Sequence, residues 1–275
     1  MLRNRSQRIL QQRDRGGNEV DLKEGMSRKA GSSTRERQKA RRFDRKALCL
    51  FGIAVVVCLM ILMLAGLRIG GLVSLAITAA CLVFLKYINT DFNAAIDHVL
   101  EREKHSTRGA EAEEKVGGLL ETLDKKRFQI FHDVVLGYGN IDHILLRRDG
   151  AIFIVETKSH FGKISQDGFQ LLRDGYPLEK DFIKQTLGQV MRLREQLMGY
   201  AGRDLWVNGI LCFTKGFIQV RGPIKGIRVI PSKWLLEKLD EGKVNEDLAD
   251  WLWEYFATLL TLPPKAVEPP SLPVE

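Results

Sequence analysis

The stretch NIDHILLRRDGAIFIVETK, residues 140–158, decides the fold, because it contains two strand-like runs separated by a turn. The Asp149-Gly150 pair predicts a hairpin loop in which glycine takes the position with positive φ. With the turn at this pair, Asp142 faces Glu156 across two antiparallel strands. Directly opposed residues have Cβ atoms about 4.5–5.5 Å apart. Two carboxylates at that separation can hold one cation.

Strand alternation adds a third charged residue to this pair. Residues two apart share one face of a strand, so Lys158 lies on the same face as Asp142 and Glu156. The rest of that face is apolar and consists of Ile144, Leu146, Ile152 and Ile154. Charges at the end of an apolar face cost free energy unless they are paired or bound to a metal. A catalytic metal site accounts for all three charges, and a buried ion cluster is the structural alternative.

The residue types fit phosphodiester hydrolysis. Carboxylate oxygens are the ligands that Mg²⁺ prefers, and Mg²⁺ commonly takes only one or two of them together with substrate phosphate. Mn²⁺ is the expected substitute. A lysine on the same face can position an attacking water and stabilise charge on the phosphate. The pattern therefore favours a metal-dependent nuclease.

Several short motifs occur in a fixed order around this hairpin. They are Gly-Ala-Glu-Ala-Glu at 109–113, Ile-Asp-His at 141–143, Val-Glu-Thr-Lys at 155–158, Phe-Gly-Lys-Ile at 161–164, and a helix that carries Gln185. Over roughly residues 108–230 they resemble the nuclease-related domain (NERD) family of the PD-(D/E)xK nuclease superfamily. Ala112 and the Asp181-Phe182 pair depart from the family pattern, and neither is a proposed ligand.

The resemblance implies an α/β fold of the restriction-endonuclease-like kind, a mixed sheet flanked by helices. It implies a catalytic set of Asp142, Glu156, Lys158, Glu113 and Gln185, of which Asp142, Glu156 and Glu113 would bind the metal. Gln185 and Gln189 are i, i+4 neighbours that can both point inward. A Glu113 that only favours the start of a helix is the structural alternative for that residue.

Periodicity predicts the remaining elements of this α/β domain. Helices are expected at 109–124, 178–200, 232–239 and 245–260, and strands at 128–136, 140–146, 151–158, 162–165, 169–172, 205–213 and 227–230. The domain is expected to span residues 108–262, with a Pro-rich tail at 263–275.

The N-terminal segment holds the excess positive charge of the chain. The net charge is +8 overall, whereas residues 1–46 carry 15 basic and 6 acidic side chains. Few apolar residues occur there, so we expect a disordered arm. Its charge would contact anionic lipid or nucleic acid, or would serve only as a topology signal.

Two apolar runs follow the arm. Residues 47–67 contain no charged side chain, and roughly 20 apolar residues are needed to cross a bilayer. A second run at 69–88 predicts a transmembrane hairpin, joined to the domain by a charged connector at 89–107. The basic residues before the first run place both termini in the cytoplasm. The expected location is therefore the cell (inner) membrane, with multiple passes.

Two functions from different classes follow from these features. The first is a membrane-anchored nuclease that hydrolyses DNA on the cytoplasmic side, with nucleic acid and the lipid bilayer as partners. The alternative is a catalytically silent adaptor that binds nucleic acid or a protein partner through a nuclease fold. A membrane scaffold without a nucleic-acid role would rest on the arm and the apolar runs alone.

Overall fold

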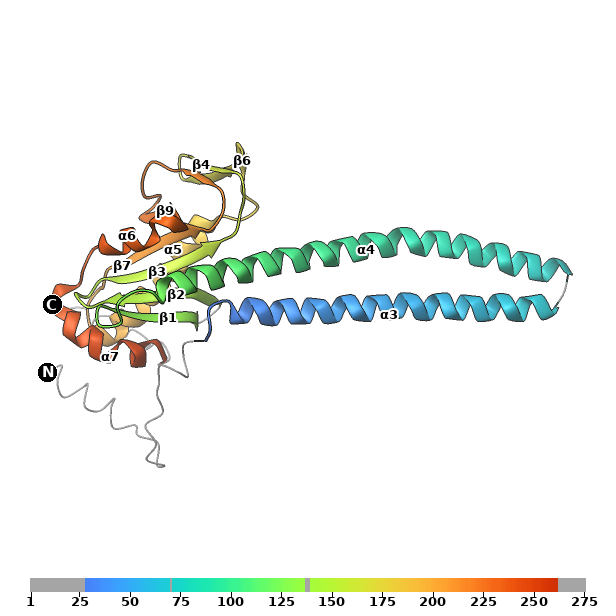
Figure 1. The fold of residues 1–275 in the computed structure, drawn as a ribbon, viewed down its shortest axis with the longest axis horizontal. Coiled ribbons are helices and arrows are strands. Elements are labelled where there is room, and N and C mark those ends of the chain that lie inside the picture. The colour runs from blue at the N-terminus through green and yellow to red at the C-terminus, as the bar shows by residue number, and fades with distance from the viewer. Residues whose placement is uncertain (1–27, 70, 137–138, 262–275) are drawn as a thin grey trace, which may run out of the picture.

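The computed structural model describes residues 28–69, 71–136 and 139–261. An α/β domain carries a long helical hairpin that extends away from it (Figure 1). The hairpin consists of α3 (Ser32–Ile69) and α4 (Gly71–Leu120). Because α4 has no break, the hairpin and the domain share one continuous helix.

The hairpin differs from the expected arm and connector. Residues 32–46, which the sequence placed in a disordered arm, belong to α3, and the connector at 89–107 belongs to α4. These residues are helical because α3 packs antiparallel against α4. Local composition does not reveal such a tertiary contact. The first 27 residues of the arm and the Pro-rich tail at 263–275 lie outside the described residues.

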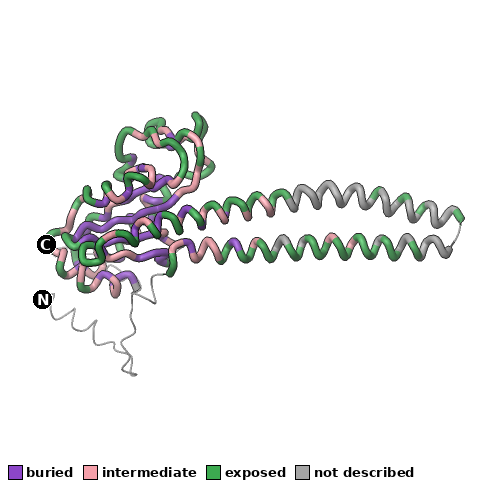
Figure 2. Tube along the Cα trace, viewed as in Figure 1, coloured by how far each residue is buried: buried purple, intermediate pink, exposed green. Residues whose placement is uncertain are grey.

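The two apolar runs form the part of the helical hairpin that lies farthest from the α/β domain. The structure shows whether these helices are long and apolar enough to cross a membrane. Within residues 28–69, 71–136 and 139–261, no helix combines the length and apolar character that crossing a bilayer requires. The spans predicted at 47–67 and 69–88 are therefore not supported, although a helical hairpin is present. Much of α3 is exposed (Figure 2). Its exposed side chains include the large apolar residues Leu50, Phe51, Ile53, Met60, Ile61 and Leu64.

The domain is built on a mixed five-stranded sheet. Its strand order is β1-β2-β3-β7-β9, antiparallel from β1 to β3 and parallel from β3 to β9. The strands are β1 (Phe128–Val135), β2 (Asn140–Arg147), β3 (Ile152–Lys158), β7 (Val207–Phe213) and β9 (Ile227–Pro231). This agrees with the predicted α/β class with a mixed sheet between helices.

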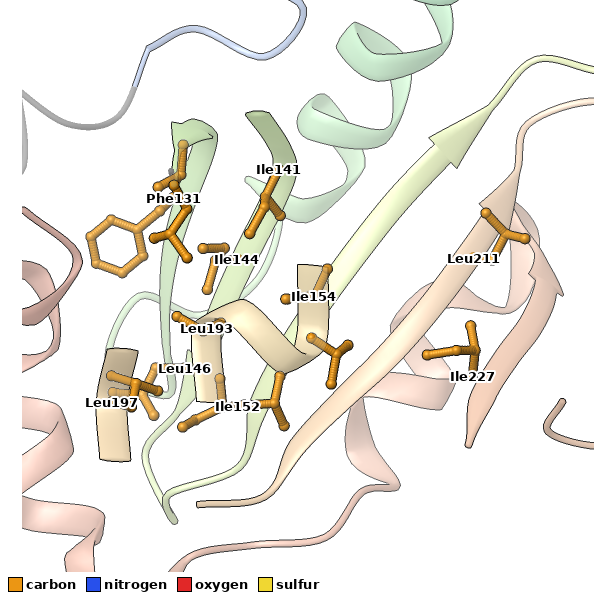
Figure 3. Close-up of a cluster of buried hydrophobic side chains, with 14 of the residues drawn as sticks. Phe131, Ile141, Ile144, Leu146, Ile152, Ile154, Leu193, Leu197, Leu211 and Ile227 are labelled. Atoms are coloured by element: carbon orange, nitrogen blue, oxygen red, sulfur yellow. The ribbon is translucent and has the colours of Figure 1, made fainter. Parts of the chain in front are cut away.

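Helices cover both faces of this sheet. They are α5 (Phe182–Ala201), α6 (Leu235–Asp240) and α7 (Ala249–Thr261), with short 3₁₀ turns η1 (Ser232–Trp234) and η2 (Glu246–Leu248). On one face α5 and α7 pack against the isoleucines and leucines of β2 and β3, as Figure 3 shows for Leu193 and Leu197 of α5. On the other face Val116 and Leu120 of α4 join Leu235 and Leu239 of α6. The apolar face predicted for strands β2 and β3, with Ile144, Leu146, Ile152 and Ile154, is thus confirmed as part of the core.

The β2–β3 turn explains the register of the two strands. Gly150 has a φ of 90°, and a Cβ at that position would lie 2.7 Å from the Asn245 carbonyl oxygen, so glycine is required. The pairs run from Leu146 with Ile152 to His143 with Val155. This is the predicted register.

A second, smaller sheet stands apart from the main one (Figure 1). Its order is β6-β5-β4-β8, formed by β4 (Lys163–Asp167), β5 (Gln170–Arg173), β6 (Tyr176–Pro177) and β8 (Phe217–Gln219). The sequence predicted β4 and β5. It did not predict β6 and β8, which have two and three residues and are too short to show alternation.

Candidate active site

The carboxylate pair lies where β2 and β3 leave the apolar core. Extending the observed register places Asp142 opposite Glu156. The backbone N–H of Thr157 donates to Asp142 Oδ2 at 2.7 Å, which fixes the Asp142 carboxylate against β3. The hairpin thus brings together the two acids that the sequence paired.

Glu156 is the most firmly held of these groups. It is 3 % exposed, and its Oε1 accepts from Lys158 Nζ at 2.6 Å and from Gln185 Nε2 at 2.7 Å. Gln189 Nε2 donates to Oε2 at 2.8 Å. Both glutamines lie one helical turn apart on α5, as their spacing predicted. The Asp181 side chain caps that helix by accepting from the Lys184 N–H.

Lys158 lies between the acids and an aromatic ring. Its Nζ is 4.7 Å from the centroid of the Phe182 ring and makes an ion pair with Glu156. The lysine side chain is 14 % exposed, against 4 % for Glu156. The ammonium group is therefore at the edge of the core, where it can contact a ligand that approaches from outside.

Glu113 reaches this cluster from α4. Burial raises its pKa to about 7; the hydrogen bond from Thr34 opposes the rise, and the charges of Glu156 and Asp133 add to it. The Thr34 hydroxyl, from α3, contacts both Glu113 oxygens at 2.8 and 3.0 Å. The sequence did not predict this threonine, because it lies in the segment that was interpreted as a disordered arm.

The cluster contains three carboxyl groups but one lysine, so ionisation of all three acids would leave an excess of negative charge. Burial raises the pKa of Asp142 well above its usual range, and the charges of Glu156 and Glu113 raise it further. Lys158 and the Thr157 N–H act in the opposite direction. Such mutual perturbation among carboxylates is typical of functional sites, since a cation would relieve it.

The donor set fits a divalent cation with few protein ligands. Among the described residues, no three His, Cys, Asp or Glu side chains form a group that could hold a metal ion. The three-carboxylate site of Asp142, Glu156 and Glu113 stays a prediction. Thr34 holds the Glu113 carboxylate on the α3 side. Asp142 and Glu156 remain as the hard oxygen donors, and two carboxylates suffice for Mg²⁺.

His143 follows Asp142 directly on β2, so its side chain points to the opposite face of the sheet. Its Nδ1 is 2.8 Å from Nδ1 of His132, whose Nε2 is 2.9 Å from Glu121. Burial and the neighbouring His132 lower the pKa of His143 well below its usual range. His160 packs against Phe182 with ring centroids 5.0 Å apart. The β1–β2 register, which pairs His132 with His143, was the signal that could have revealed the histidine pair.

Of three comparisons with known proteins, one gave a match, and it covers the segment that carries this cluster. Searches of curated proteins and of solved structures gave no match. Residues 108–214 match the family described as the nuclease-related domain (NERD). This segment contains Glu113, the carboxylate pair, Lys158 and both glutamines. The match supports the NERD family for this part of the chain and suggests a nuclease-like function for it.

Proposed function

We propose that the domain is a metal-dependent nuclease that hydrolyses phosphodiester bonds in DNA. The observation that carries this proposal is the placement of two carboxyl groups, Asp142 and Glu156, beside the single ammonium group of Lys158, which leaves a surplus of negative charge when both acids are ionised. A purely structural ion cluster would be balanced, whereas a site for a cation and a phosphate needs this surplus before its ligands bind.

Each side chain has a distinct role in this proposal. Asp142 and Glu156 would hold Mg²⁺ or Mn²⁺, which supplies positive charge against the scissile phosphate and lowers the pKa of the attacking water. Lys158 stabilises charge that develops on the phosphate oxygens. Gln185 and Gln189 fix the Glu156 carboxylate through their amide donors. Gln185 is on the exposed side of α5, so it can also contact the phosphate.

A nuclease assay of the full chain tests the activity. Circular single-stranded and circular double-stranded DNA are incubated with Mg²⁺, Mn²⁺ or EDTA. We expect cleavage with either metal and none with EDTA. Circles distinguish internal cleavage from cleavage at ends, and RNA circles of the same sequence test the preference for DNA. The absence of cleavage under every condition would contradict the proposal.

Metal titration of Glu156→Gln tests the assignment of the ligands. The substitution removes one anionic oxygen and keeps the shape of the side chain. We expect weaker Mg²⁺ and Mn²⁺ binding by calorimetry, with an unchanged circular dichroism spectrum. Glu179→Gln, at an exposed acid, is the matched control. Equal affinity in both variants would show that the carboxylate pair is structural.

A second candidate function rests on the contacts of Glu156. Both of its oxygens already accept hydrogen bonds from protein donors, as expected of a site that no longer performs chemistry. This favours an adaptor that binds nucleic acid or a protein without cutting. Binding of DNA in the assay above, with no product in Mg²⁺ or Mn²⁺, would select the adaptor.

We further propose that the hairpin attaches the domain to a membrane. The support is the uncharged run at 47–67 and the exposed apolar side chains of α3, such as Phe51, which is 67 % exposed. Large exposed apolar surfaces mark protein or membrane contacts. Reporter fusions at residues 40 and 275 should give the same, cytoplasmic, compartment. Recovery of the full chain in the soluble fraction without detergent would contradict the attachment.

A further inference from the structure

Two exposed aromatic rings lie just beyond the active-site strands. Phe161 is 51 % exposed and Phe217 is 64 % exposed. Phe161 follows Lys158 by three residues, so the two lie within about 10 Å along the chain. Phe217 begins β8. Neither ring contributes to the two apolar cores of the domain.

Backbone hydrogen bonds join the two segments that carry these rings. The Thr214 N–H donates to the Lys158 carbonyl, and the Phe217 N–H donates to the Gly162 carbonyl, both at 2.9 Å. Gly216 allows this close approach, since a Cβ there would lie 2.8 Å from the Gly162 oxygen. The segments that leave β3 and β7 are thereby fixed to each other next to Lys158.

Cationic side chains lie over the Phe161 ring, and a lysine pairs with Phe217 across the small sheet. Lys215 Nζ is 4.6 Å and Arg108 Cζ is 5.7 Å from the centroid of Phe161. Lys163 is the cross-strand partner of Phe217. Segments 159–180 and 214–226, which form the small sheet and its connections, contain six Lys and Arg residues but only three Asp and Glu residues. This surface therefore carries a net positive charge.

A cavity of about 300 Å³ opens beside Phe161. Arg108, His160 and Arg173 line it together with the acids Asp174 and Glu179. The Asp174 carboxylate accepts from the Lys163 N–H at 2.7 Å, so part of its charge is offset. Burial lowers the pKa of His160, and the charges of Lys158 and Arg173 lower it further. The cavity thus shares the positive surroundings of Lys158.

We propose that Phe161 and Phe217, with Arg108, Lys163 and Lys215, form a platform on which an unpaired base stacks next to the scissile phosphate. Exposed rings interleaved with cations are the means by which proteins bind single strands without reading sequence. Bases in an intact duplex are stacked on each other and cannot lie on a side-chain ring. The preferred substrate is therefore a single strand, or a duplex region with unpaired bases. This inference rests on the proposed function for its position next to Lys158.

Binding measured in EDTA tests the platform without cleavage. The full chain and its variants are titrated with a fluorescent single-stranded oligonucleotide and with a hairpin duplex of the same length. We expect Phe161→Ala and Phe217→Ala each to weaken single-strand binding about tenfold, and duplex binding by less than about twofold. Phe161→Tyr keeps a stacking surface and should restore the affinity.

Trp234→Ala is the matched control for these variants. Trp234 is 46 % exposed and lies under the ammonium group of Lys233, as Phe161 lies under that of Lys215, but it is in η1. We expect no change in single-strand binding for this variant. Melting temperatures of all variants should agree with that of the wild-type chain, which separates loss of the ring from loss of the fold.

The outcomes distinguish the platform from the nuclease. Equal loss of single-strand and duplex binding, or no loss of either, would overturn the platform even if the protein cleaves DNA. Selective loss in a protein that never cleaves would support the platform and contradict the nuclease. If the alanine variants keep their DNA affinity but change the sedimentation mass, the rings form a contact between two copies of the chain, and the proposal is wrong.

Discussion

Two charged clusters lie at opposite ends of the β2–β3 hairpin, and they differ in how their charges are balanced. At the turn, buried Arg147 donates to Asp149 at 2.8 Å and to the carbonyls of Leu239 and Asp240 at 2.6 and 2.7 Å. Although burial alone would raise the pKa of Asp149, the contacts of Arg147 and the Ala151 N–H lower it. Every charge at this end has a partner.

The open end of the hairpin shows the reverse. There one lysine faces Asp142, Glu156 and Glu113, and the pKa values of Asp142 and Glu113 are raised rather than lowered. Each cluster includes a buried charged residue of this hairpin, Arg147 in one and Glu156 in the other, so burial alone does not identify a functional site. The two clusters differ instead in the direction of their carboxylate pKa shifts, which are raised at Asp142 and Glu113 and lowered at Asp149.

The largest loss of stability is expected when Arg147, the buried cation of the cluster at the β2–β3 turn, is replaced. Arg147→Met leaves the Leu239 and Asp240 carbonyls without a donor, and a buried acceptor that loses its partner costs about 1–3 kcal/mol. Arg148→Met is the control, because the Arg148 side chain is exposed, pairs with Asp250 and lies over the Trp253 ring, and an exposed ion pair contributes at most about 1 kcal/mol. Urea denaturation measures both. If the two variants are equally stable, the contacts of Arg147 do not stabilise the fold, and the cluster at the turn is not structural.

Lys158→Ala tests the unbalanced cluster through catalysis. Loss of a charge that stabilises the transition state lowers rates by about 10²–10³-fold, so we expect that loss of cleavage while DNA still binds. Lys184→Ala, at an exposed lysine of α5, should cleave normally.

Melting of Lys158→Ala with EDTA and with Mg²⁺ completes this test. We expect Mg²⁺ to stabilise the variant more than the wild-type chain, because the variant has lost the lysine that pairs with Glu156. If the variant is unstable with and without Mg²⁺, Lys158 belongs to a structural ion cluster. A stable variant that cleaves at the wild-type rate would contradict its catalytic role.

The raised pKa of Glu113 predicts a dependence of stability on pH. A carboxyl group with a pKa of about 7 in the fold is less easily ionised there than in the unfolded chain. The free energy of unfolding should therefore fall as the pH rises from about 4.5 to about 7, and then level off. Glu113→Gln lacks this titration and should gain about 1–3 kcal/mol over the wild-type chain by pH 8.

Denaturation of both proteins at pH 5 and pH 8 measures this difference. Mg²⁺ should reduce it at pH 8, because a bound cation favours the ionised carboxylates. A difference that is the same at both pH values would show that Glu113 does not share the electrostatic field of the cluster.

The smallest expected effect concerns the contact between α3 and Glu113. Thr34→Val removes one hydroxyl donor, which contributes about 1 kcal/mol. The same change should raise the pKa of Glu113 further, since this hydroxyl lowers it, and the pH window of the preceding prediction should move upward. Thr122→Val, at an exposed threonine, is the control. If the pH range over which the stability changes is the same in Thr34→Val and in the wild-type chain, the Thr34 hydroxyl does not influence the ionisation of Glu113.

The sequence predicted the site better than it predicted the surroundings of the site. The positions of Asp142, Glu156 and Lys158 follow from strand alternation and one glycine turn, which are local rules. Gln185 and Gln189 follow from helical spacing. These five residues lie in elements whose faces are set by the apolar pattern of their own neighbours.

The contacts that the sequence did not predict are made over long separations. Thr34 meets Glu113 across 79 residues, and the segment around Thr34 has no apolar pattern to indicate a helix. Ser32 likewise donates to Asp133 across 101 residues. The close approach of Ala30 requires glycine at position 117, where a Cβ would lie 2.3 Å from that of Ala30. Such complementarity is visible only once both segments are placed.

The unbroken course of α4 sets a fixed length in the molecule. From Gly71 at the tip to Glu113 at the site, one helix rises about 60 Å at 1.5 Å per residue. Because α3 packs along α4, the two helices keep the tip of the hairpin at a fixed distance from the site. If the domain cleaves DNA as proposed, a contact made at the tip would hold the cleaved phosphate at about this distance from it.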